Sequence, residues 1–250
     1  MTGRPVFAVM IAAALSAPAA AQQAAEPPDR WAFTFEVGFN GASGNTELAV
    51  LTTALGVKRI ETDAFELDWT ASYRYGESEE RVVARNIRSS LSFDLWPAAR
   101  WSPFVFVDAE RDPFLRLDIR TNAGSGVKYT FVERENSAVS LSAAVIHSYE
   151  EFGTPAGATP IDARSDARWS LRGKASHTFE NGLAVENTSW FKPVFDDTGD
   201  YNIDATTKLG VKLSSSIGLN FSHTYRRDST PPPDVETDDQ VLQIGLLIEF

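Results

Sequence analysis

Hydrophobic and polar residues alternate along most of this chain. In the segment 65–75 every odd-numbered residue is apolar or aromatic, and every even-numbered residue is polar or charged. Residues 117–131 and 201–213 largely repeat the pattern. A period of two is that of a β-strand with one apolar and one polar face. The pattern therefore predicts strands that have lipid or a core on one side and water on the other.

Twelve segments of this kind follow one another. They are residues 31–40, 47–59, 65–75, 83–95, 101–111, 117–131, 138–149, 167–179, 183–195, 201–213, 217–227 and 240–250. The number is even, and most segments reach the roughly 9–11 residues that a tilted strand needs to cross a bilayer. We therefore predict an all-β fold, a transmembrane antiparallel β-barrel of about twelve strands. The facing of the fifth strand stays ambiguous, because Phe104 and Phe106 share their parity with Asp108 and Glu110.

The two ends of the chain predict export to the bacterial outer membrane. Residues 1–21 have one cation, a short apolar run and small residues before Gln22, as a cleaved signal peptide does. Residues 22–30 are predicted to be a flexible lead-in and residues 31–250 the barrel. The last strand resembles the terminal strand that the barrel-assembly machinery reads as an insertion signal. Its apolar face consists of Leu242, Ile244, Leu246, Ile248 and Phe250.

The predicted connections and aromatic residues agree with a barrel. Short turns are expected at one end, at residues 61–64, 96–100, 132–137, 180–182 and 214–216. The longest connections, 150–166 and 228–239, fall at the other end. Aromatic residues gather near both ends of the strands, as they do at the two interfaces of a membrane. A soluble β-sandwich is the alternative, but it requires no such placement.

Composition narrows the function. The chain has 34 acidic and 23 basic residues, a net charge of −11 and no cysteine. The acidic balance argues against nucleic-acid binding. Mean hydropathy is only −0.21, which suits a barrel because every second residue faces water. We expect a monomer without a cofactor, whose partners are outer-membrane lipid, lipopolysaccharide and the assembly machinery.

Four short motifs suggest a family. Gly44-Asn45-Thr46-Glu47 opens the second strand, and Tyr73-Arg74-Tyr75, Arg111-Asp112 and Gly124-Ser125-Gly126 follow. Together they resemble the YdiY-like family of salt-induced outer-membrane proteins over nearly the whole chain after the signal peptide. The resemblance implies a small outer-membrane barrel linked to salt or osmotic response. It implies no reaction, substrate or functional residue.

Charged residues on the polar faces are the main functional candidates. Those predicted to line the lumen are Glu36, Glu66, Asp68, Arg74, Arg88, Asp118, Arg120, Lys128, Arg168, Arg172, Lys174, Lys192, Asp204 and Lys208. Further members are Asp94, Asp108, Glu110, Glu186, Lys212 and Arg226. Opposed clusters of charge across a pore create a field that selects ions or zwitterions. The same charges can instead pair and plug the lumen, so a narrow diffusion channel and a closed structural barrel both stay open.

Two other functions have weaker support. All three histidines fall on lipid-facing positions, and His147 near the outer rim is a candidate for a lipid-modifying enzyme. No segment resembles the motifs of such enzymes, so we predict no catalytic residue. Acidic residues fill the outer connections, which suggests adhesion or divalent-cation binding. They are Glu77, Glu79, Glu80, Glu150, Glu151, Asp162, Asp196, Asp197, Asp200, Asp234, Glu236, Asp238 and Asp239. Their spacing matches no EF-hand loop, and we predict no metal site.

Overall fold

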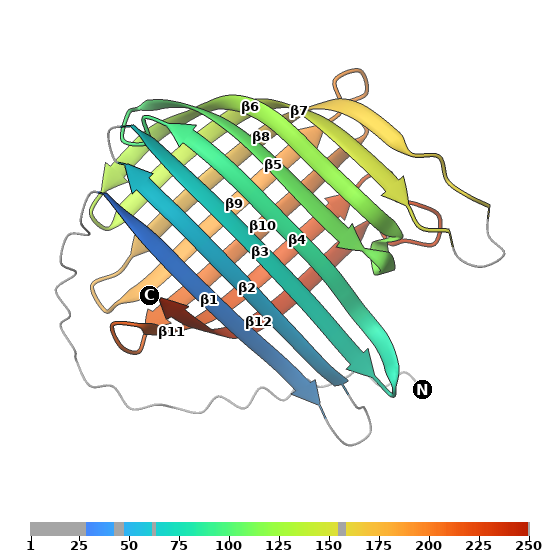
Figure 1. Cartoon of the computed structure of the whole chain (residues 1–250), viewed down its shortest axis with the longest axis horizontal. Coiled ribbons are helices and arrows are strands. Elements are labelled where there is room, and N and C mark those ends of the chain that lie inside the picture. The colour runs from blue at the N-terminus through green and yellow to red at the C-terminus, as the bar shows by residue number, and fades with distance from the viewer. Residues whose placement is uncertain (1–28, 43–47, 62–63, 155–158, 250) are drawn as a thin grey trace, which may run out of the picture.

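The computed structural model is a closed antiparallel barrel of twelve strands (Figure 1). It describes residues 29–42, 48–61, 64–154 and 159–249. The strands are β1 (Asp29–Ala42), β2 (Leu48–Glu61), β3 (Phe65–Ser78), β4 (Arg81–Leu95), β5 (Trp101–Asp112), β6 (Leu117–Arg134), β7 (Ser137–Phe152), β8 (Arg164–Thr178), β9 (Leu183–Pro193), β10 (Tyr201–Lys212), β11 (Ile217–Asp228) and β12 (Asp238–Glu249). The predicted fold class is confirmed. The signal peptide, Gly44-Asn45-Thr46-Glu47 and Phe250 lie outside the described residues.

Each strand pairs with its neighbours in sequence, and the first strand closes the ring on the last. The closing ladder between β1 and β12 is short and runs from Thr34 opposite Glu249 to Gly38 opposite Gly245. We call the end where β1 begins and β12 finishes the termini end. The opposite end, which carries the longer connections, is the loop end and lies at the right of Figure 1.

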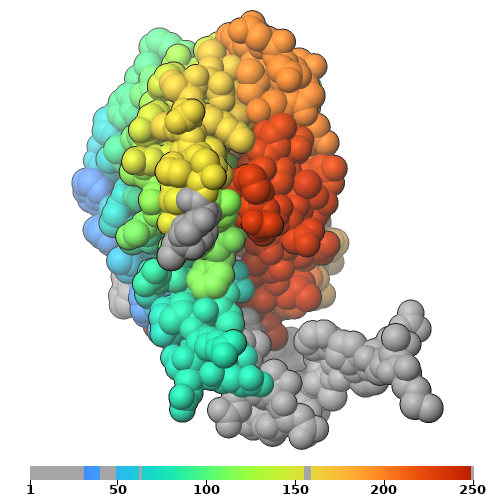
Figure 2. Space-filling model, turned by 90° about the vertical axis from the view of Figure 1, so that its right-hand side faces the viewer, coloured from blue at the N-terminus to red at the C-terminus, as the bar shows by residue number. Residues whose placement is uncertain are grey.

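The loop end is crowded by its connecting segments. The described residues near the loop-end termini of β7, β9 and β11 lie side by side, where they appear yellow, orange and red in Figure 2. A short 3-10 turn, η1 (Pro113–Leu115), follows β5, and the Asp112 carboxylate accepts a hydrogen bond from the Phe114 amide at 3.0 Å. No helix in the described ranges is long and apolar enough to span a bilayer.

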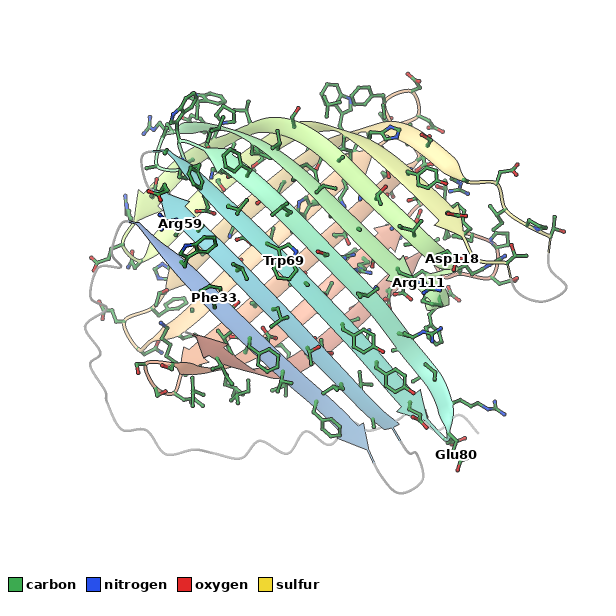
Figure 3. The ribbon with its side chains drawn as sticks, viewed as in Figure 1. Phe33, Arg59, Trp69, Glu80, Arg111 and Asp118 are labelled. Atoms are coloured by element: carbon green, nitrogen blue, oxygen red, sulfur yellow. The ribbon has the colours of Figure 1, made fainter. Side chains whose placement is uncertain are left out.

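The barrel is apolar outside and polar inside. Large apolar side chains cover its outer wall, and Phe33 of β1 is 46% exposed there (Figure 3). In contrast, nine polar or charged residues are buried among the described residues, against six apolar ones. A continuous apolar wall far exceeds the few-hundred-Å² patches that soluble monomers expose. The outer wall therefore needs a lipid environment, and the interior tolerates charge because its ionic groups pair.

The inward-facing aromatic residues of the fifth strand lie opposite two glycines. Phe104 and Phe106 point inward and lie opposite Gly126 and Gly124 of β6. A Cβ on Gly126 would lie 2.3 Å from the Ala143 carbonyl oxygen, and one on Gly124 would lie 2.6 Å from Ile146. Only glycine leaves room here, since such distances are far below van der Waals contact.

The space left by the glycines holds an apolar cluster inside the barrel. Phe104, Ala144 and Ile146 are buried together, and Phe106 packs against them. The cluster lies on one wall of the lumen, formed by β5, β6 and β7. The Gly124-Ser125-Gly126 motif therefore allows β6 and β7 to pack closely in the lumen wall.

Candidate functional site: the charged lumen

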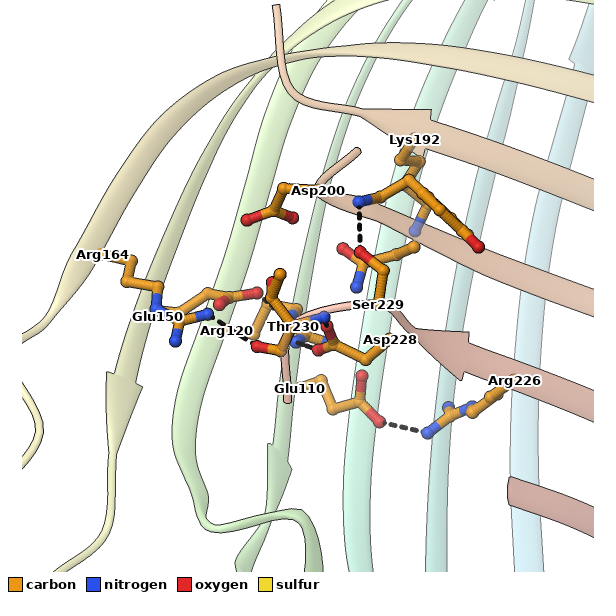
Figure 4. A network of polar contacts seen from close by, with 12 residues as sticks. Glu110, Arg120, Glu150, Arg164, Lys192, Asp200, Arg226, Asp228, Ser229 and Thr230 are labelled. Atoms are coloured by element: carbon orange, nitrogen blue, oxygen red, sulfur yellow. Dashed lines mark hydrogen bonds and ion pairs between the residues drawn. The ribbon is translucent and has the colours of Figure 1, made fainter. Parts of the chain in front are cut away.

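Charged residues from opposite walls meet inside the barrel. The centre of this network is Glu110 on β5, whose side chain is only 3% exposed. Its carboxylate accepts hydrogen bonds from Arg88 of β4 at 2.7 Å and from Arg226 of β11 at 2.8 Å. In a ring of twelve, β5 and β11 are six strands apart, so they face each other across the lumen. The Glu110–Arg226 pair therefore bridges the barrel (Figure 4).

Asp204 on β10 completes this bridge from the other wall. Lys192 of the neighbouring β9 donates to its carboxylate at 3.1 Å, and the Arg226 Nε lies 3.5 Å away. Arg88 of β4, six strands from β10, reaches within 4.0 Å. We call Arg88, Glu110, Asp204 and Arg226 the lumen bridge. It alternates cations and anions across the full width of the barrel.

A second cross-lumen contact lies nearer the loop end. Arg120 on β6 donates through Nε to Glu150 of β7 at 2.5 Å and through Nη2 to Asp228 of β11 at 3.2 Å (Figure 4). Glu150 was predicted to be an acidic loop residue. That prediction is wrong, because β7 continues to Phe152 and places the Glu150 side chain inside, 3% exposed. A cavity of about 40 Å³ lies between these contacts and Pro231-Pro232 of the last connection.

Arg168 links β8 to the start of β10 at the rim of the loop end. Its side chain is 2% exposed, and Nη1 donates to Asp200 at 3.0 Å and to Asn202 at 3.2 Å. Its Nη2 donates to Asp166 at 3.3 Å. Asp200, which was predicted to be an acidic residue of an outer connection, is thus bound to β8. Arg168, which was predicted to line the lumen, therefore acts as a structural anchor at the rim.

A larger cavity occupies the lumen toward the termini end. Its volume is about 350 Å³, and four cations and four anions line it. They are Lys58, Lys128, Arg172, Lys174, Glu66, Asp68, Asp94 and Glu133. The lumen is thus divided into a charged cavity, a set of cross-lumen ion pairs and a crowded loop end.

Of the remaining residues predicted to line the lumen, most face inward and one does not. Glu36 of β1 accepts hydrogen bonds from Gln243 at 3.1 Å and Asn220 at 3.3 Å. Arg74 and Lys208 lie on the inward-facing parity of their strands and show no ion pair among the described residues. Asp118 instead lies at a β-bulge of the loop end, 51% exposed and 4.0 Å from the outward-facing Arg111 (Figure 3). The prediction that Asp118 faces the lumen assumed unbroken alternation along the strand, and the bulge interrupts that alternation.

The sequence analysis did not identify several residues that contact the charged side chains of the lumen. Lys58 on β2 lines the large cavity and contacts Glu66 at 2.9 Å. Asn86 donates to Glu110 at 2.9 Å, and Asn122 donates to Asp108 at 2.9 Å. Lys58 was detectable, because it shares the parity of the inward residues of its strand. The two asparagines carried no signal of their own, since neutral polar residues are ordinary on a water-facing strand.

Comparison with known proteins places this architecture in a family. Residues 35–250 match the family described as "Protein of unknown function, DUF481". The chain belongs to the DUF481 family. No curated protein matched the DUF481 chain by sequence.

Solved structures resemble the DUF481 barrel in fold. The NanC porin matches with a TM-score of 0.51 at 9% identity, over 87% of this chain and 98% of that one. The KdgM porin gives 0.44 at 11% identity, over 88% and 99% of the two chains. The translocator domain of the autotransporter NalP from Neisseria meningitidis gives 0.46 at 10% identity, over 88% and 87%. The likeness to NanC shows a shared barrel fold and assigns no solute.

The DUF481 barrel also brings two Ser–His pairs together on its strands. His147 of β7 lies 3.5 Å from Ser165 Oγ of β8, both exposed near the loop end. Ser137 Oγ and His177 Nδ1 are 2.7 Å apart at the termini end. A nucleophilic serine also needs a group that orients its histidine. Among the described residues, neither histidine has a carboxylate within hydrogen-bond distance.

The acidic connections of the DUF481 barrel form no evident metal site. In the ranges that the structure describes, no three His, Asp or Glu residues lie close enough to hold an ion. Asp238 is instead bound by Arg227, at 2.8 Å to Oδ2, and by Tyr225.

Proposed function

We propose that this protein is an outer-membrane barrel that forms a narrow channel for ions or small solutes. The apolar outer wall supports a lipid location, and the polar interior with its 350 Å³ cavity supports a solute path. The contact between Arg226 and Glu110 carries the proposal, because it places charged groups from facing strands across the lumen. Charged rings and pairs at a constriction govern which ions pass.

The test is single-channel recording of the refolded protein in a planar bilayer at two salt concentrations. We expect small discrete current steps, smaller than those of wide porins, because the lumen bridge narrows the path. A control barrel, heat-denatured before reconstitution, should give none. A correctly folded barrel that stays silent at both salt concentrations contradicts the channel.

A silent barrel would favour the structural role that the YdiY-like resemblance implies. In that role the protein is an envelope component of salt or osmotic stress, and its lumen charges serve as a plug. The cross-lumen pairs support this reading as well, because opposite charges fill the section that they span.

The Ser165–His147 contact supports a second candidate, a lipid hydrolase at the outer rim. If this holds, the refolded barrel hydrolyses phospholipid in mixed micelles, and His147→Ala abolishes the turnover. His223→Ala is a matched control, since His223 contacts Gln240 elsewhere on the barrel. An absence of hydrolysis by the unmodified protein would rule out the candidate.

A further inference from the structure

Most charges that line the large cavity are already paired. Lys128 contacts Asp94 at 2.8 Å, and Lys58 contacts Glu66 at 2.9 Å. Lys174 lies 3.6 Å from Glu186 in a half-exposed pair. Each of these pairs is neutral as a unit, so none of them attracts an ion of one sign strongly.

Three lining charges have no ion pair among the described residues, and two of them, which are opposite in sign, lie on different walls inside the cavity. Asp68 of β3 has no ion pair or hydrogen bond to its carboxylate among the described residues, although Lys58 lies directly across from it in the ladder. Arg172 of β8 has no carboxylate within ion-pair distance in the same part of the chain. Glu133, the last charged residue of the lining, is exposed at the end of β6.

Arg172 is held in place without being neutralised. Its Nη2 donates to Ser142 at 3.2 Å, and its guanidinium lies 5.3 Å from the centre of the Phe104 ring. Its Nε is buried and has no acceptor. A guanidinium fixed by an aromatic ring and with unused donors is suited to bind a carboxylate. Asp94, Glu66 and Asp68 lie within electrostatic range of it.

The cavity therefore offers a cation site and an anion site to one ligand. Its eight lining charges balance, which disfavours a ligand with a net charge. Apolar residues, among them Ile60 and Val139, complete the lining. A volume of 350 Å³ accommodates a molecule of several carbon atoms.

We propose that this cavity binds small zwitterionic solutes, with the ligand carboxylate on Arg172 and its ammonium group on Asp68. The proposal rests on the channel function and names the class of solute that the channel takes. Binding must be weak, because a solute that enters a channel must also leave it.

The experiment compares three solutes of nearly equal size by calorimetric titration of the full-length folded barrel in detergent. They are γ-aminobutyrate, which carries both charges, butyrate, which lacks the cation, and butylammonium, which lacks the anion. We expect γ-aminobutyrate to bind more tightly than either. Equal affinities, or no binding by any of the three, would overturn the proposal.

Two variants locate the site. Asp68→Asn and Arg172→Gln should each weaken γ-aminobutyrate binding by about tenfold, the loss of one charged contact. Arg85→Gln, on an exposed position of β4, should leave the affinity unchanged. Unchanged affinity in both lumen variants contradicts the assignment. Heat-dependent gel mobility shows whether each variant is folded, and if Arg172→Gln is not, Asp68→Asn and the three-solute comparison decide.

The outcomes distinguish a failure of the zwitterion site from a failure of the channel proposal. A barrel that binds the zwitterion but passes no current keeps the site and overturns the channel. A conducting barrel that does not distinguish the three solutes keeps the channel and overturns the zwitterion site.

Discussion

Glu110→Gln is expected to raise the single-channel conductance several-fold and to shift the ion selectivity of the channel toward anions. The substitution keeps the shape of the side chain and removes the carboxylate charge that makes the shortest contacts to Arg88 and Arg226. The two guanidinium groups then share only the Asp204 carboxylate, so the contact between the facing walls weakens and positive charge predominates at this level of the lumen. The measurement is conductance and reversal potential in a potassium chloride gradient.

Glu151→Gln is the matched control for this result. Glu151 lies next to the lumen-facing Glu150 but is exposed, so its loss should change neither quantity. If Glu110→Gln conducts like the unmodified protein with the same ion preference, the lumen bridge does not limit passage.

The second large effect is on stability. Arg168→Met should lower the free energy of unfolding by about 2 kcal/mol, because it removes charged hydrogen bonds and leaves two half-buried carboxylates without their cation. Asp166 and Asp200 would face each other without the guanidinium that joins β8 to the segment before β10. Equilibrium unfolding in urea, followed by tryptophan fluorescence in detergent or lipid, measures the change.

Arg85→Met provides the comparison, since this exposed arginine of β4 should lose little stability on substitution. An equal loss in the two variants would show that Arg168 is not a structural anchor. In that case its cationic charge returns to the candidates for solute selection.

The barrel could be predicted from sequence because alternation is a local signal. In β3 each residue from Phe65 to Arg74 reports its own facing through its chemistry, with no knowledge of the partner strand. The facing of a residue could not be predicted where a bulge shifts the alternation or where the lumen wall itself is apolar. Asp118 lost its parity at a bulge of β6, and Phe104 faces inward into an apolar cluster on a wall that otherwise carries polar residues.

The candidate site was harder to predict than the fold. Sequence placed Glu110 and Arg226 on the polar face of their strands, but it gave no means to see that they touch. They are 116 positions apart in the chain, and their contact depends on the number of strands in the ring. Glu150 was assigned to a loop because Glu150 and Glu151 interrupt the alternation of apolar and polar residues shortly before β7 ends at Phe152. Pairing across a lumen is a property of the closed barrel and not of any segment.

The central claim is that Glu110 and Arg226 join facing walls of the barrel, and a double-mutant cycle tests it most directly. Unfolding free energies would be measured for the unmodified protein, Glu110→Gln, Arg226→Gln and the double variant. If the pair bridges the lumen, the double variant should lose less than the sum of the single losses, by about 1 kcal/mol or more. Strictly additive losses would contradict the bridge and the narrow channel built on it.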